Sequence, residues 1–196
     1  MLILSTIAFA ADVLVYGPLD YTESTYLAAA GHTVTTWSSS EWSAATQTDF
    51  EAFDAIVLGD EDCSGPETAD FDTLYSTRTT WSPAVTGNIL VTGNDAACHA
   101  PSKTTAQYFL VHAVEWAAAS GGTGLYASSD WGRRDFDYLD QFGSWGSTES
   151  SGDSVSITDG SHPHWTGTYG TVSNINSWGS THHAYIDTYQ IGRAHV

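Results

Sequence analysis

The sequence predicts an α/β protein built on a parallel sheet that is covered on both faces. Three short runs rich in Val, Ile and Leu, at residues 12–17, 55–60 and 88–93, each contain a glycine with an acidic residue at or close behind it. Near-continuous aliphatic runs are typical of strands buried on both faces, and the segments between them are long enough for crossover helices. Because ligands of such sheets bind beyond the carboxyl ends of the strands, the fold class also predicts where the functional site lies.

Local signals predict the remaining elements of the sheet region in chain order. Gly31 and the pair Gly121-Gly122 are suited to end helices, because glycine readily adopts the left-handed conformation of a C-terminal cap. The expected elements are a helix over 22–30, a strand over 32–37, a polar loop over 38–43, a helical turn over 48–53, a helix over 68–81, a long apolar helix over 102–120 and a fifth strand over 123–127.

Beyond Ser128 the composition changes to Gly, Ser, Trp and Asp, with one later strand-like run over 154–158. The segment 143–152 is interpreted as a surface excursion. Few aliphatic residues are available there to form an independent core. We therefore expect an irregular C-terminal lobe packed on the sheet.

Both ends of the chain carry segments that we do not expect in the mature domain. Residues 1–10 (MLILSTIAFA) are apolar and uncharged and end in an A-x-A pattern, which predicts a secretory signal peptide, with a buried first strand as the alternative. Residues 191–196 back-translate as ATC GGA AGA GCA CAC GTC, the start of a common sequencing-library adapter, and Gln190 fits the same reading frame. We expect adapter read-through over 190–196 and a single domain over 11–189.

The charge balance restricts the partners of this chain. It has 23 acidic against 5 basic residues and a formal net charge of −18. Phosphate binding depends on Lys and Arg, so nucleic acids and anionic membranes are not expected partners, and no membrane insertion is expected. The composition is typical of exported or salt-adapted proteins, and we expect the protein to be secreted or held at the cell surface.

Several segments resemble a known superfamily. The segments LAAAGHTVTTW, DFEAFDAIVLGD and SHPHW are similar to the class I glutamine amidotransferase-like superfamily, and VLGDEDC, WSPAVTGNILVTGNDAACH, GGTGLY and SWGSTHHAYIDTY resemble a domain of secreted and cell-surface bacterial proteins with no assigned function. The resemblance covers nearly the whole mature chain. It implies a three-layer flavodoxin-like fold with strand order 2-1-3-4-5.

Catalytic members of that superfamily use a cysteine on a tight elbow after a central strand, activated by a histidine. Cys98 and His99 resemble that pair, with His183 as the nearest further histidine, so a hydrolase or amidase is one hypothesis. The glycines of a strained elbow are absent, however, and Cys98 lies several residues beyond the expected strand end. The implied fold makes the third and fourth strands neighbours, and in an exported chain this favours a disulfide between Cys63 and Cys98, which excludes a thiol nucleophile.

Polar residues gather after the expected third, fourth and fifth strands. They could bind a ligand or a hard cation such as Ca²⁺, act as acid and base on a sugar, or merely cap the following helices. The candidate ligand-binding residues are Asp60, Asp62, Asn94, Asp95, His99, Asp130 and Trp131. The C-terminal lobe also contains four indole rings that are either core residues or, if exposed, could stack on sugars: Trp131, Trp145, Trp165 and Trp178.

Metal and cofactor signals are weak. His162 and His164 form an H-x-H pair without an evident third zinc ligand, and no calcium-loop pattern is present. The first loop lacks a G-x-G-x-x-G pattern, so we expect no nucleotide or flavin cofactor. The leading hypothesis is a secreted, non-catalytic module that binds a ligand or partner at the cell surface, with carbohydrate as a candidate. The alternatives are the amidotransferase-like hydrolase and a purely structural spacer.

Overall fold

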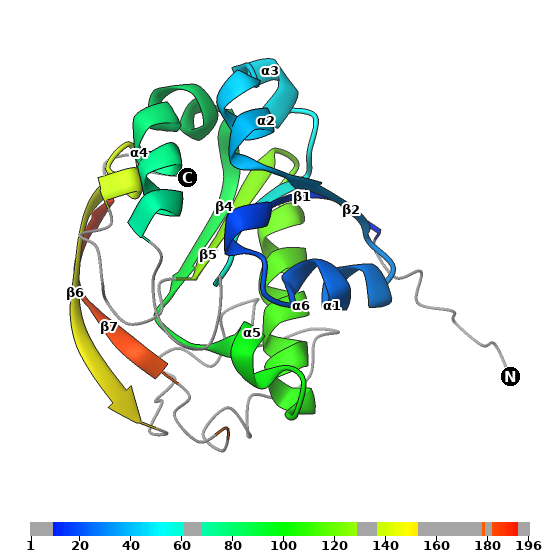
Figure 1. Ribbon diagram of the computed structural model, residues 1–196, viewed down its shortest axis with the longest axis vertical. Coiled ribbons are helices and arrows are strands. Elements are labelled where there is room, and N and C mark those ends of the chain that lie inside the picture. Colours follow the sequence, from blue (N-terminus) through cyan, green and yellow to red (C-terminus); the bar gives the residue numbers. More distant parts are fainter. Residues whose placement is uncertain (1–9, 61–67, 129–136, 153–177, 179–181, 192–196) are drawn as a thin grey trace, which may run out of the picture.

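The computed structural model describes residues 10–60, 68–128, 137–152, 178 and 182–191. A five-stranded parallel sheet forms the centre with helices on both faces, and a separate two-stranded antiparallel sheet lies to one side (Figure 1). This three-layer arrangement confirms the expected α/β fold class. Among the described helices, none combines the length and the apolar character needed to cross a bilayer.

The strands and helices follow one another as the aliphatic runs and glycine positions predict. In chain order they are β1 (Asp12–Tyr16), η1 (Gly17–Leu19), α1 (Glu23–Ala29), β2 (Thr33–Trp37), α2 (Ser39–Ala44), α3 (Gln47–Phe50), β3 (Ala55–Leu58), α4 (Thr68–Trp81), η2 (Ser82–Ala84), β4 (Val85–Thr92), α5 (Ala96–His99), α6 (Thr104–Ala118), β5 (Thr123–Ser128), η4 (Asp137–Leu139), β6 (Gly143–Gly152) and β7 (His182–Ile191).

The order of strands in the parallel sheet is β2-β1-β3-β5-β4, so the expected order 2-1-3-4-5 is wrong in its last two positions. β5 is buried along its whole length and pairs with both β3 and β4, whereas most of β4 is only half buried. Helix α6 lies close to β5. A Cβ atom on Gly124 of β5 would overlap the carbonyl of Ala117 in α6, so the small residues of β5 allow the helix to lie directly on this strand.

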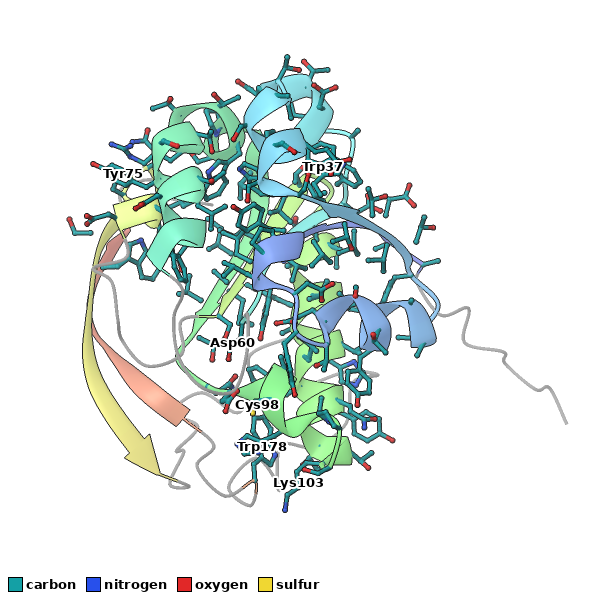
Figure 2. The ribbon with its side chains drawn as sticks, in the orientation of Figure 1. Trp37, Asp60, Tyr75, Cys98, Lys103 and Trp178 are labelled. Carbon is teal, nitrogen blue, oxygen red and sulfur yellow. The ribbon has the colours of Figure 1, made fainter. Side chains whose placement is uncertain are left out.

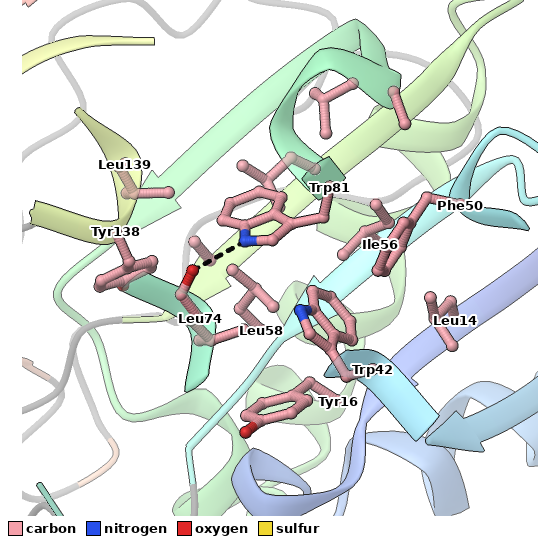
Figure 3. Packing of buried hydrophobic residues seen from close by; sticks show 14 of the residues in the cluster. Leu14, Tyr16, Trp42, Phe50, Ile56, Leu58, Leu74, Trp81, Tyr138 and Leu139 are labelled. Carbon is pink, nitrogen blue, oxygen red and sulfur yellow. Dashed lines mark hydrogen bonds between the residues drawn. The ribbon is translucent and has the colours of Figure 1, made fainter. Parts of the chain in front are cut away.

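One face of the sheet packs against α2, α3 and α4 through a cluster of large rings, which we call the aromatic core (Figure 3). The Trp42 ring lies at its centre, with ring centroids 4.9 Å from Tyr16, 4.7 Å from Phe50 and 6.0 Å from Trp81. The Trp81 indole donates a hydrogen bond of 3.0 Å to the Leu74 carbonyl. The polar edge of this ring is therefore satisfied inside an apolar layer.

The opposite face packs against α1 and α6 through smaller side chains. Val13, Val15 and Val57 meet residues such as Leu110 and Val114, all of them fully buried. Alternate residues of each strand enter the two layers, which is why the strands read as continuous apolar runs.

Two segments differ from the sequence-based expectation. The expected polar loop over 38–43 is largely the helix α2, which begins with a capping box in which Ser38 and Glu41 each bond to the backbone amide of the other. The expected surface excursion over 143–152 is the strand β6, which pairs antiparallel with β7. The C-terminal lobe is thus not wholly irregular, and β7 includes Gln190 and Ile191, which pair with Ser144 and Gly143.

Candidate functional site

The carboxyl ends of β3, β4 and β5 present polar residues at one edge of the sheet, as the fold class predicts. Asp60 follows β3, and Asn94 and Asp95 follow β4. Because β5 lies between these two strands, its last residues enter the site as well: the Ser128 hydroxyl donates a hydrogen bond of 3.1 Å to the Asn94 carbonyl. Figure 2 shows Asp60 and Cys98 at this same end of the sheet.

A fully buried glutamate joins the loops that follow β1 and β3. The Glu23 carboxylate accepts hydrogen bonds from the backbone N–H groups of Asp60 at 2.8 Å and of Tyr21 and Thr22 at 3.0 Å each. Burial raises the pKa of Glu23 to about 8, because the loss of hydration outweighs these N–H donors. A Cβ atom on Gly59 would overlap this carboxylate, so only glycine leaves room for it.

A second contact ties the loop after β1 to α5. The Thr22 hydroxyl donates a hydrogen bond of 2.8 Å to the Ala97 carbonyl. On the other side, the Tyr21 backbone N–H also donates to the Asp60 carbonyl at 3.0 Å, and the Tyr21 side chain is 44% exposed. An accessible aromatic ring therefore lies on the loop that is bonded directly to Asp60.

Asp95 and His99 form an ion pair at the start and end of α5. Their side chains approach to 3.6 Å between Oδ2 and Nε2, with Asp95 buried and His99 partly exposed. The His99 ring lies 6.0 Å from that of Trp178, and the Trp178 indole donates a hydrogen bond of 2.9 Å to the Thr105 hydroxyl. Trp178 is 3% exposed, so of its two expected roles the structure supports the core role and not the stacking on a sugar.

Tyr126 of β5 brings a buried hydroxyl to the same place. Burial raises its pKa well above the usual value, and the nearby carboxylates of Glu23, Asp60 and Asp95 raise it further. The Ser128 hydroxyl is close enough to lower this pKa, but the two oxygens do not meet at hydrogen-bond geometry. Within the described part of the chain, neither the Tyr126 hydroxyl nor Asn94 Oδ1 has a hydrogen-bond partner, and each such buried group costs about 1–3 kcal/mol.

The candidate thiol is not available as a nucleophile in this structure. Cys98 lies in α5 and is disulfide-bonded, and the described residues include no free cysteine. Its expected partner, Cys63, lies outside the described residues, and the pairing stays a prediction. Because β5 separates β3 from β4, the expectation that these two strands are neighbours is not a valid reason for that pairing.

Some of the remaining sequence candidates lie within the residues that the structure describes, and others do not. His183 lies in β7 of the antiparallel sheet, and Trp145 is partly buried against the aromatic core. In the ranges that the structure describes, no group of three or more His, Cys, Asp or Glu side chains could hold a metal ion. The candidates that lie outside the described residues are Asp62, Asp130, Trp131, His162, His164 and Trp165.

Sequence reasoning missed Tyr21, Glu23, Tyr126 and Ser128. The sequence offers no signal for Glu23, because an acidic residue in the first turn of a helix is usually exposed and favoured by the helix dipole. Tyr126 and Ser128 could have been found only with the correct strand order, which places β5 at the centre of the site.

Comparisons with protein families, with curated proteins and with solved structures found no match to this chain. The resemblance to the amidotransferase-like superfamily stays a prediction, and the function must be argued from the geometry of the site.

Proposed function

We propose that this protein is a secreted, non-catalytic α/β module that binds a ligand or partner at the cell surface through the carboxyl edge of its sheet, with carbohydrate as the candidate ligand class. The observation that carries this proposal is the gathering of Asp60, Asn94, Asp95 and His99 at the carboxyl edge, with the exposed residue Tyr21 on the loop that is bonded to Asp60. Carboxylate and amide oxygens next to an accessible aromatic ring suit a ligand with several hydroxyl donors and an apolar face.

The disulfide-bonded state of Cys98 supports a binding role over thiol chemistry. A cysteine nucleophile must be a free thiolate, and Cys98 is bonded. Disulfides persist in oxidising compartments, which agrees with the export that residues 1–10 predict. We include in the proposal that Cys63 is the partner of Cys98, because the sequence contains two cysteines in all.

The first experiment is the intact mass of the purified protein after thiol alkylation, with and without prior reduction. We expect no alkylation before reduction and two alkyl groups after it. If Cys98 is alkylated rapidly in the native protein, the non-catalytic proposal fails and the amidase alternative becomes the better hypothesis. For protein that is exported with its own leader, we expect an intact mass that corresponds to a chain starting at Ala11. A mass that includes residues 1–10 would contradict the export proposal.

The second experiment tests binding by the oxidised protein on a panel of soluble glycans with isothermal titration calorimetry. The variant Asp60→Asn removes a charge at the site and should weaken binding, whereas Glu51→Gln removes an exposed charge at the end of α3 and should not. Equal binding by both variants would show that the carboxyl edge is not the binding surface.

A further inference from the structure

Two buried polar groups at the carboxyl edge have no hydrogen-bond partner among the described residues. They are Asn94 Oδ1 and the Tyr126 hydroxyl. Asn94 exposes 9% of its surface to solvent, and Tyr126 exposes none. The Asn94 backbone is held on both sides, since its N–H donates to the Thr92 hydroxyl at 3.2 Å and its carbonyl accepts from Ser128. Buried groups of this kind are usually paired, so their position is typical of a site that a ligand completes.

The Tyr126 hydroxyl lies close enough to several acidic side chains to feel their charge. The charges of Glu23, Asp60 and Asp95 all act on it, although these residues come from α1, the end of β3 and the start of α5. Tyr126 lies in β5, and Asn94 follows the end of the neighbouring strand β4, whose last residues pair Val91 with Ala127 and Thr92 with Ser128. The two unpartnered groups and the carboxylates therefore belong to the same carboxyl edge of the sheet.

The hydrogen-bonding chemistry of this place restricts the ligand. The Asn94 amide oxygen and an ionised carboxylate only accept hydrogen bonds, and the Tyr126 hydroxyl can accept one as well as donate one, so a ligand with several hydrogen-bond donors suits these groups best. The described ranges contain two cationic side chains, those of Arg78 and Lys103. Arg78 is bonded to Asp140 at 3.0 Å, and Figure 2 shows Lys103 at the outer end of the molecule with its side chain directed away from Asp60.

A positive charge on the ligand matches these conditions. The acidic side chains of Asp60 and Asp95 repel an anionic ligand, whereas Glu23, with a pKa of about 8, keeps its proton at the pH of the test below. The described side chains do not form a group of three or more His, Cys, Asp or Glu that could hold a metal ion. A protonated primary amine offers three N–H donors and one positive charge, which fits acceptor oxygens that converge from several directions. Tyr21, whose backbone is bonded to Asp60, is exposed and supplies an aromatic ring to the loop next to this edge.

We propose that the carboxyl edge binds the protonated amino group of its ligand, and that within the carbohydrate class the ligand is an amino sugar. This inference rests on the proposed function, because it names the ligand class of the same site.

The test compares three β-1,4-linked hexasaccharides that share one backbone: a glucosamine oligomer, an N-acetylglucosamine oligomer and a glucose oligomer. Isothermal titration calorimetry at about pH 6 and low salt should show the glucosamine oligomer binding at least about tenfold more tightly than the other two. Asp60→Asn should reduce that preference several-fold, and the matched exposed variant Glu51→Gln should keep it. A uronic acid oligomer and CaCl₂ alone serve as further probes.

Each outcome has a distinct meaning. Equal binding of the three oligomers, or preferred binding of the uronic acid, overturns the amine inference and leaves the proposed carbohydrate binding intact. Saturable binding of Ca²⁺ without any oligosaccharide overturns it in favour of a metal site. If none of these probes binds, both the amine inference and carbohydrate binding fail. If the glucosamine preference is the same for Asp60→Asn and the wild type, the amine binds elsewhere and the inference is wrong.

Discussion

Replacing Glu23 with glutamine is expected to remove a large part of the pH dependence of folding stability. The Glu23 side chain is fully buried and its pKa is raised from 4.5 to about 8, chiefly by desolvation. The folded protein therefore keeps a proton, between those two pH values, that the unfolded chain releases. The contribution to stability is complete below pH 4.5, decreases as the pH rises and is lost above about pH 8.

The size of this effect follows from the difference between the two pKa values. A difference of about 3.5, at about 1.4 kcal/mol for each pKa unit, corresponds to about 5 kcal/mol across the range. Small domains have unfolding free energies of about 5–15 kcal/mol, so the change is large enough to measure by urea unfolding.

Urea unfolding of wild type and Glu23→Gln should be measured from about pH 5.5 to about pH 8.5. The free energy of unfolding of the wild type should fall more steeply with pH, because glutamine does not ionise. At the lowest pH the variant should be less stable by about 1–3 kcal/mol. The reason is that a glutamine NH₂ group cannot accept a hydrogen bond from a backbone N–H, such as that of Asp60, which donates to Glu23 in the wild type. Glu51→Gln is the control for the loss of one negative charge.

Parallel pH profiles for the wild type and Glu23→Gln would refute this reasoning. They would mean that Glu23 ionises at the same pH in the folded and unfolded protein, and that its burial does not govern its protonation. A change in slope for Glu51→Gln of the same size would assign the effect to general charge repulsion instead.

Three further changes test the packing and the surface, all by urea unfolding. Gly59→Ala should cost about 1–3 kcal/mol, because its methyl group overlaps a backbone carbonyl, and unchanged stability would contradict this close packing. Trp81→Phe should cost about 1–3 kcal/mol, since the Leu74 carbonyl loses its donor inside the core, and wild-type stability would show that this bond is dispensable. Asp140→Asn should cost less than about 1 kcal/mol, because the ion pair with Arg78 is partly exposed; a loss that persists in about 1 M NaCl would mean that charge is not the cause.

The elements whose residues carry strong local signals were predictable from the sequence. The aliphatic runs of β1 and β3 and the helix-ending glycines Gly31 and Gly121 are found as expected, and both glycines have positive φ, at 99° and 78°. In these cases the local preference of the residues and the tertiary structure agree. The same holds for the gathering of polar residues at the carboxyl edge, because the place where parallel strands end depends on topology alone, whereas the use of this edge as a binding site stays a prediction.

The order of the last two strands was not predictable from aliphatic content. β4 contains Ile89, Leu90 and Val91 and reads as a central strand, yet it lies at the edge of the sheet. β5 is less aliphatic, yet it lies inside the sheet, where Gly124 lets α6 approach closely. The order of strands depends on contacts between elements, which the aliphatic content of a single strand does not indicate.

The chemistry of the candidate site was only partly predictable for the same reason. Asp60, Asn94, Asp95 and His99 follow strand ends and could be found by position. Glu23 could not, because its burial depends on backbone N–H groups from two loops that are far apart in the sequence.

The helical layers on the two faces of the sheet give the protein two natural optical probes. Trp37, Trp42 and Trp81 in the aromatic core meet edge to face, at centroid distances of 6.4 Å and 6.0 Å, so their electronic transitions couple and should give strong circular dichroism that depends on rigid packing. On the other face, the Trp178 indole is buried beside the His99 ring, so its emission should shift when water reaches it. The dichroism and the emission shift thus report on opposite sides of one sheet, and the loss of one signal before the other would reveal a layer that loosens first, without any added label.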